Sequence, residues 1–141
     1  MRLLPAFERL ALTLWVGGLC AIGYIAAPAL FIIVDDRALA GAVADRLFGL
    51  MSYVGLVCGV GLLGAWWWRR EARGRGAWRL WAVGTMLALT LIAEFGLSAR
   101  MDTLDAAGAA FERLHHAVAA LFVAETLLGL GLVLAPPASP R

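Results

Sequence analysis

Apolar residues in this chain form four long stretches that are separated by short charged connections. The first stretch, from Leu10 to Val34, is twenty-five residues without a charged side chain. A helix needs about 20 predominantly apolar residues to cross roughly 30 Å of hydrocarbon at about 1.5 Å per residue. The pattern therefore predicts four membrane-spanning helices, at residues 10–34, 47–68, 80–99 and 114–135.

These four helices predict an all-α integral membrane protein, an antiparallel four-helix bundle with residues 1–135 as its single domain. Residues 35–46 are charged at both ends but rich in Ala and Leu, and we expect a helical turn on the membrane surface that runs into the second span. Pro136 and Pro137 cannot continue a helix, so residues 136–141 are expected to be a short disordered tail.

Composition supports a place in the bilayer. The chain is 62% hydrophobic and only 16% charged, which is too apolar for an ordinary soluble domain of 141 residues. Its net charge is a mild +2, and no basic face on a soluble module is present, so nucleic acid is not an expected partner. The expected partner is the lipid bilayer.

Arginine placement predicts the orientation. Three tryptophans, Trp66 to Trp68, end the second span, and an arginine-rich connection follows at residues 69–79. Short basic loops stay on the cytoplasmic side, and aromatic belts mark the interfaces. We therefore predict that this connection and both termini are cytoplasmic, with eight arginines inside and four outside, and that the arginines contact anionic lipid.

Small residues indicate how the helices pack. In the first span a helical face holds Gly17, and we expect this face, with Thr13, Cys20, Tyr24, Ala27 and Phe31, to point into the bundle. Pro28 lies near the far end of that span and should kink the helix or end it soon after. Gly55 and Gly59 form a Gly-x-x-x-Gly pair, which predicts close packing against a neighbouring helix or against a second copy of the chain.

Two glutamates lie within the predicted spans. A charged side chain at mid-span costs on the order of 2.5 to 3.5 kcal/mol on insertion scales. Glu94 lies near the outer end of the third span and can reach water there, whereas Glu125 is ten residues into the fourth. Glu125 therefore either carries a proton or faces a partner within the bundle.

Histidine and cysteine are the remaining candidate ligands. His115 and His116 lie near the outer end of the fourth span, and the helical repeat places Glu125 nearer the His115 face, so His115 is the predicted inward residue. Cys20 and Cys58 lie near the middle of their spans. Thiolates with His or Glu can bind a soft metal such as copper, although a buried Cys more often acts as a small hydrophobic residue.

Several short motifs, in this order, resemble the transmembrane-protein-205-like family: Trp15-Val16-Gly17-Gly18, Ala27-Pro28-Ala29-Leu30-Phe31, Ala40-Gly41 with Leu47-Phe48, and Phe111 with Leu114-His115. The resemblance implies a four-helix membrane protein, distantly like the membrane domain of copper-resistance protein D, with bacterial members whose role is not settled. His116 departs from the family pattern because it doubles the histidine. A bacterial inner-membrane location is the expectation.

Two classes of function follow from these residues. The first is a non-enzymatic transport, resistance or scaffold element with a polar site near the outer face, under the bend at Ala27–Pro28–Ala29, where Glu94 and His115 should gather. The second is a haem- or quinone-binding protein that uses His115 or His116; bis-histidine haem is disfavoured because both histidines lie on one helix. No nucleophile elbow, metalloprotease motif or phosphate loop is present, so an enzyme is the weakest hypothesis.

Overall fold

A computed structural model describes residues 3–68, 77–101, 103–104 and 108–135 of the chain. Residues 69–76, most of the arginine-rich connection predicted at 69–79, and the predicted tail at 136–141 lie outside this range. The described part is helical and contains four helical stretches that are long and apolar enough to cross a membrane. The prediction of four long apolar helices is therefore confirmed, while their path across a membrane and the side on which each end lies stay predictions.

The first stretch consists of three consecutive elements: α1 (Leu3–Ala21), a π-helical turn η1 (Ile22–Ala26) and α2 (Ala27–Ile33). Pro28 is near the start of α2, where it cannot donate a backbone hydrogen bond. The wider π turn immediately before it is a common cause of a helix bend. The helix then ends at Ile33, so the expectation that it stops soon after Pro28 is confirmed.

The second stretch is a single helix, α3 (Arg37–Trp68). Asp36 caps its start, since the Asp36 carboxylate accepts hydrogen bonds from the backbone N–H groups of Ala38 at 2.9 Å and Leu39 at 3.2 Å. Ala40 and Ala44 are already buried within the bundle. The expectation of a surface turn at residues 35–46 is corrected: most of that segment is the beginning of the spanning helix itself.

The third stretch contains α4 (Ala77–Leu91), a second π-helical segment η2 (Ile92–Ser98) and the short α5 (Ala99–Met101). The fourth is α6 (Ala109–Leu134), a continuous helix. Both stretches begin three to five residues before the predicted start of their spans and end within two residues of the predicted end.

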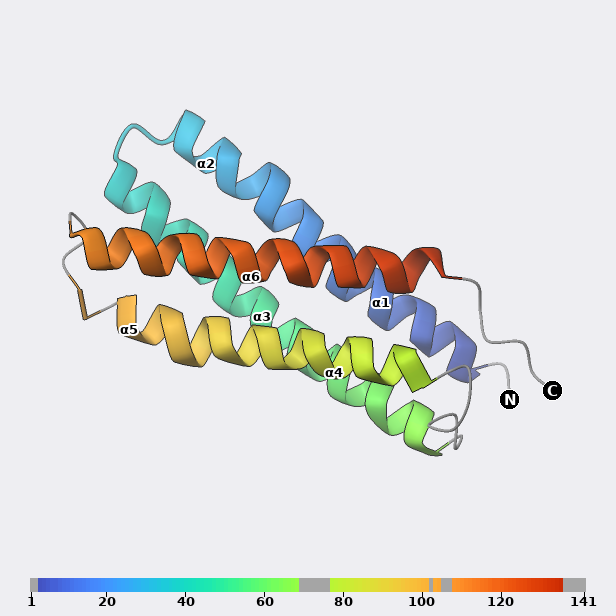
Figure 1. The fold of residues 1–141 in the computed structure, drawn as a ribbon. Coiled ribbons are helices and arrows are strands. Elements are labelled where there is room, and N and C mark those ends of the chain that lie inside the picture. Colours follow the sequence, from blue (N-terminus) through green and yellow to red (C-terminus); the bar gives the residue numbers. More distant parts are fainter. Residues whose placement is uncertain (1–2, 69–76, 102, 105–107, 136–141) are drawn as a thin grey trace.

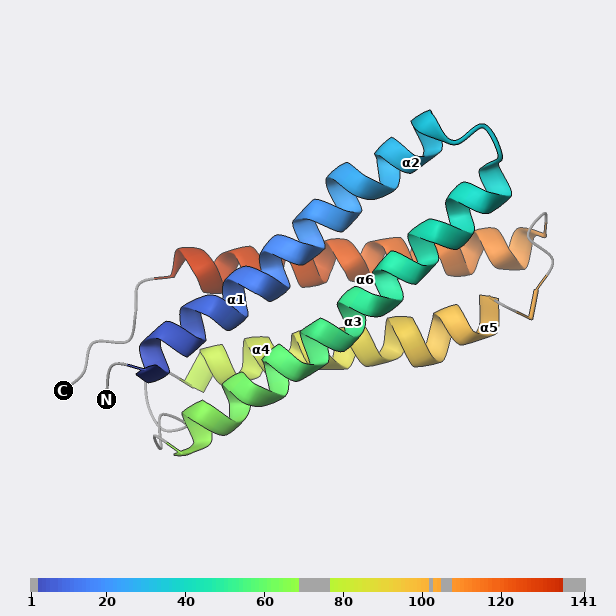
Figure 2. The ribbon, with the colours of Figure 1, turned by 180° about the vertical axis from the view of Figure 1, so that it is seen from behind.

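The four stretches form a bundle in which α1 packs on α3 and α6, and α4 packs on the same two helices (Figures 1 and 2). The end of α3 and the start of α4 lie at one end of the bundle together with the start of α1 and the end of α6 (Figure 1). We call this the tryptophan end, because Trp66, Trp67, Trp68, Trp78 and Trp81 are on its helices. The opposite end, where α2 turns into α3, is called the α2 end.

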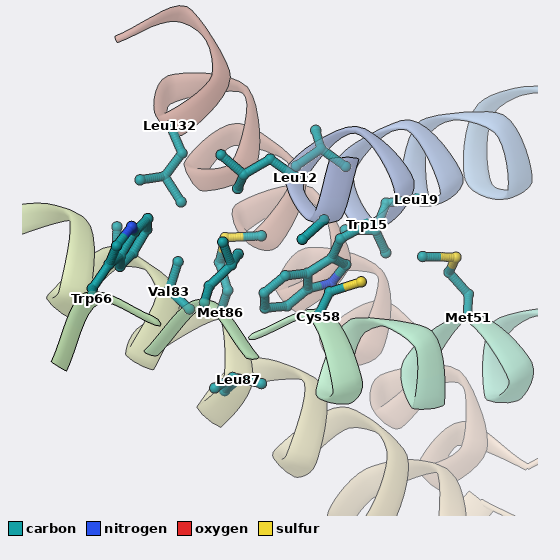
Figure 3. Close-up of a cluster of buried hydrophobic side chains, with 14 residues drawn as sticks. Leu12, Trp15, Leu19, Met51, Cys58, Trp66, Val83, Met86, Leu87 and Leu132 are labelled. Atoms are coloured by element: carbon teal, nitrogen blue, oxygen red, sulfur yellow. The ribbon is translucent and has the colours of Figure 1, made fainter. Parts of the chain in front are cut away.

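The core lies around Trp15, whose side chain is 0% exposed (Figure 3). Its indole lies against α3 over Gly55 and Gly59. A Cβ added at Gly55 would be 2.5 Å from Trp15 Nε1, and one at Gly59 would be 2.6 Å from Leu87 Cδ2. The close packing predicted for the Gly55–Gly59 pair is therefore confirmed, and it takes place within the chain.

The inward face predicted for the first span is wrong. Gly17 is exposed with open space around it, and Tyr24 is 52% exposed; Thr13 and Phe31 are exposed as well. The helix instead buries the face that holds Leu12, Trp15, Val16 and Leu19, while Ala27 of the predicted set is buried. The large side chains of this face fill the space between the helices.

Candidate functional site

Three polar side chains meet near the middle of the bundle. Glu125 of α6 is only 5% exposed, and its Oε1 accepts hydrogen bonds from Trp15 Nε1 of α1 at 3.1 Å and from Thr90 Oγ1 of α4 at 2.8 Å. Together with Gly55, over which the Trp15 indole lies, these residues form what we call the central layer. Glu125 thus links three helices: of the two alternatives that the sequence left open, a proton or a partner within the bundle, the structure shows partners.

The backbone around the central layer leaves little freedom to its polar groups. Thr90 Oγ1 also lies 3.0 Å from the carbonyl oxygen of Met86, one turn earlier in α4. Gly55 allows the indole nitrogen to approach α3, because any side chain there would occupy its place. The orientation of the Trp15 donor toward Glu125 is therefore fixed by packing on one side and by the hydrogen bond on the other.

A second polar layer lies one helical turn nearer the α2 end. Glu94 of η2 is half-buried, and its Oε2 accepts a hydrogen bond from Ser52 Oγ of α3 at 3.1 Å. Ser52 Oγ is also 3.0 Å from the carbonyl oxygen of Phe48, and a Cβ at Gly49 would lie 3.2 Å from Glu94 Oε1. Glu94 therefore lies against α3 rather than at a free helix end.

Residues of the two layers are about one helical turn apart on both α3 and the third stretch. Glu94 follows Thr90 by four residues on the third stretch, and Ser52 precedes Gly55 by three on α3. Residues three or four apart lie on one face of a helix, about one turn from each other. The two glutamates consequently lie in consecutive layers of the same interior.

An aromatic cluster lies beside the second polar layer. The Phe122 ring of α6 is 5.7 Å from that of Tyr24 and 5.4 Å from that of Phe48, with the latter pair edge to face. A Cβ at Gly23, within η1, would be 2.1 Å from Phe122 Cζ, too close for a real contact. Gly23 is thus required for Phe122 to enter between the first span and α3.

The histidines lie away from both layers, contrary to the sequence expectation. His115 and His116 are exposed on α6; the His115 ring stacks on Phe111 at 6.3 Å and is 6.2 Å from the ring of His116. No hydrogen bond in the described part of the chain joins either histidine to Glu94. The expectations that His115 faces inward and gathers with Glu94 are therefore wrong. The prediction extended the inward face of Glu125 along the helix to His115, but His115 is exposed at the start of α6.

Cys20 and Cys58 are free thiols. Cys58 is buried in the core near Trp15 (Figure 3), and Cys20 packs against this core. Within residues 3–68, 77–101 and 108–135, no group of three or more His, Cys, Asp or Glu side chains could hold a metal ion. The metal hypothesis gains no support from the arrangement of the cysteines, which lie among hydrophobic side chains.

A separate polar contact lies at the tryptophan end. Trp66 Nε1 donates a hydrogen bond to Glu8 Oε1, and the guanidinium of Arg79 lies 5.7 Å from the centre of the Trp66 ring. Arg79 Nη2 is 3.5 Å from the carbonyl oxygen of Leu132. This contact joins α1, α3, α4 and α6 at the end opposite the second polar layer.

Sequence reasoning identified Glu94 and Glu125 but missed Trp15 and Ser52 as their partners. Tryptophan is enriched at membrane interfaces, and a buried indole N–H usually has an acceptor. The position of Trp15 within a span, away from the interfacial tryptophans, was the available signal. No comparable signal marks Ser52, since serine in a spanning helix can also bond its own backbone, as Ser52 does with Phe48.

A family model described as a domain of unknown function, DUF4149, matches residues 10–110 of the chain. The match includes Trp15, Ser52, Thr90 and Glu94 and ends before Glu125. No curated protein and no solved structure shows significant similarity to the chain.

Proposed function

The chain belongs to the DUF4149 family, and we propose that it is a non-enzymatic transport or resistance element of the membrane, whose working part is the pair of polar layers around Glu94 and Glu125. The observation that carries this proposal is the half-buried carboxylate of Glu94, which lies four residues along the third stretch from Thr90, the hydrogen-bond partner of the buried Glu125. Ionisable residues inside a membrane are costly, and they commonly mark ion or substrate pathways. A bundle that served only as a scaffold needs no second carboxylate at this position.

The other half of the bundle supports a site that opens in one direction. Toward the tryptophan end, the interior is filled by Leu62, Val83 and Leu132, each 0% exposed, and by Trp66 at 2%. Close packing of this kind leaves no room for water or a solute. The polar layers are therefore proposed to be reached from the α2 end.

We assign the α2 end to the outer face of a bacterial inner membrane. The arginine-rich connection at the tryptophan end and the positive-inside rule support this orientation, as does the resemblance to the transmembrane-protein-205-like family. A reporter fused after Arg141 should then register as cytoplasmic; activity of an exported reporter at the same position would reverse the assignment. Homo-oligomerisation through small-residue faces stays a prediction, and the Gly55–Gly59 face is not free for it.

Thiol labelling tests whether the site is open. In a Cys20→Ala, Cys58→Ala background, Ser52→Cys places a thiol beside Glu94, and Val83→Cys places a matched thiol in the filled half. A membrane-impermeant maleimide added to the outer side should modify Ser52→Cys and leave Val83→Cys unmodified. If Ser52→Cys reacts only after the protein is unfolded in detergent, the interior is closed and the protein is a scaffold instead.

A further inference from the structure

Among the described residues, the side chains that bond to Glu125 are uncharged. Its two hydrogen-bond donors, the indole of Trp15 and the hydroxyl of Thr90, are both neutral. In the part of the chain that the structure describes, no arginine or histidine pairs with the carboxyl group. The core cluster that contains Trp15 also holds the thiol of Cys58, and Cys20 packs against this cluster; the carboxyl group of Glu94 lies four residues from Thr90 along the third stretch.

If Glu125 were ionised, a full negative charge would lie in an apolar environment. Only two neutral groups would donate hydrogen bonds to it, both to Oε1. Such a charge is expensive to bury unless a cation or several donors compensate it. A neutral carboxylic acid avoids this cost and makes the same contacts. The neutral glutamic acid is therefore the favoured form of Glu125.

The hydrogen-bond inventory agrees with a neutral acid. The Thr90 hydroxyl has one proton but lies within hydrogen-bond distance of two acceptors, the carbonyl oxygen of Met86 and Glu125 Oε1. A protonated Glu125 can donate to Thr90 Oγ1 while Thr90 donates to Met86, so that both contacts are satisfied. Trp15, which can only donate, retains the carboxyl group as its acceptor.

We propose that Glu125 is a proton-binding site that is loaded and emptied from the α2 end through Glu94. In the unloading step the O–H bond of Glu125 breaks, the proton passes along the Thr90 side of the interior, and an O–H bond forms on the Glu94 carboxylate. Release from Glu94 to water at the α2 end completes the step, with no change in oxidation state. The filled half beyond the central layer excludes exchange from the tryptophan end.

This inference rests on the proposed function, because it assigns the proton as the species that the polar layers bind. Infrared spectroscopy of the reconstituted protein tests it separately from thiol labelling. The carbonyl stretch of a protonated carboxylic acid should be present in the wild type, absent in Glu125→Gln and retained in the control Glu112→Gln, which changes an exposed glutamate on the first turn of α6. A wild-type spectrum without a band that Glu125→Gln removes would overturn the proton site.

Two further measurements complete the test. Thr90→Val should shift the frequency of the band, since the acid loses its hydroxyl partner, and this readout does not depend on the folding of Glu125→Gln. Transfer to deuterated buffer should shift the band as the proton exchanges, and Glu94→Gln should slow this exchange several-fold relative to Glu112→Gln. Equal exchange rates in Glu94→Gln and the wild type would exclude the route through Glu94. If Ser52→Cys is not labelled in the folded protein but the infrared band shows a protonated Glu125, the proposed function alone is refuted.

Discussion

The substitution Thr90→Val measures the tie between α4 and α6 directly. It removes the hydroxyl that bonds Glu125 at 2.8 Å and keeps a side chain of nearly the same shape. Interhelical hydrogen bonds in membrane proteins average about 0.6 kcal/mol and reach about 1.7 kcal/mol. We expect Thr90→Val to lower the free energy of unfolding by an amount in this range. This corresponds to a ratio of folded to unfolded protein that is about 3- to 16-fold lower.

Thr126→Val is the matched control. Thr126 is 2% exposed and Thr90 is 4% exposed, so both substitutions are made in the same environment. Thr126 Oγ1 bonds the carbonyl oxygen of Phe122 in its own helix at 2.9 Å, as Thr90 bonds that of Met86, but it has no partner on another helix in the described structure. Back-bonding of this kind contributes little to stability, so Thr126→Val should change the free energy of unfolding by a few tenths of a kcal/mol.

The assay is reversible unfolding in mixed detergent micelles, followed by tryptophan fluorescence. Thr90→Val should be more costly than Thr126→Val in the wild-type background and equal to it in a Glu125→Leu background, where the partner is absent. The double-mutant cycle isolates the coupling between Thr90 and Glu125. Equal effects of the two valine substitutions in the wild-type background would refute the interhelical hydrogen bond between Thr90 and Glu125.

Two further predictions concern packing and the histidines. Gly23→Ala places a methyl group against the end of the Phe122 ring, 2.1 Å from Cζ, and should destabilise the protein by about 1–3 kcal/mol in the same unfolding assay. Gly17→Ala meets open space and should be neutral or stabilising; equal effects would contradict the placement of Phe122. His115→Ala and His116→Ala should each change the free energy of unfolding by less than about 0.5 kcal/mol, because both side chains are exposed. The visible spectrum of the purified wild-type protein should show no Soret band; a Soret band that either substitution removes would contradict this prediction.

Sequence by itself determined the architecture of the membrane domain. The length and hydrophobicity of the four stretches are set by the thickness of the bilayer, so the spanning helices can be counted without a structure. The same reasoning found Glu94 and Glu125, since a carboxyl group in an apolar stretch is conspicuous whatever surrounds it. The close approach of helices at Gly55 and Gly59 also followed from their spacing.

The tertiary structure alone decided which side of each helix faces inward. In water, hydrophobic residues indicate the buried face, but lipid tails are as apolar as leucine, so hydrophobicity does not distinguish the core of this bundle from its surface. The exposed position of Gly17 and His115 and the burial of Trp15 follow from the shapes of side chains on helices that are distant in sequence. For the same reason, the hydrogen bond between Trp15 and Glu125, which are 110 residues apart, is a product of the fold.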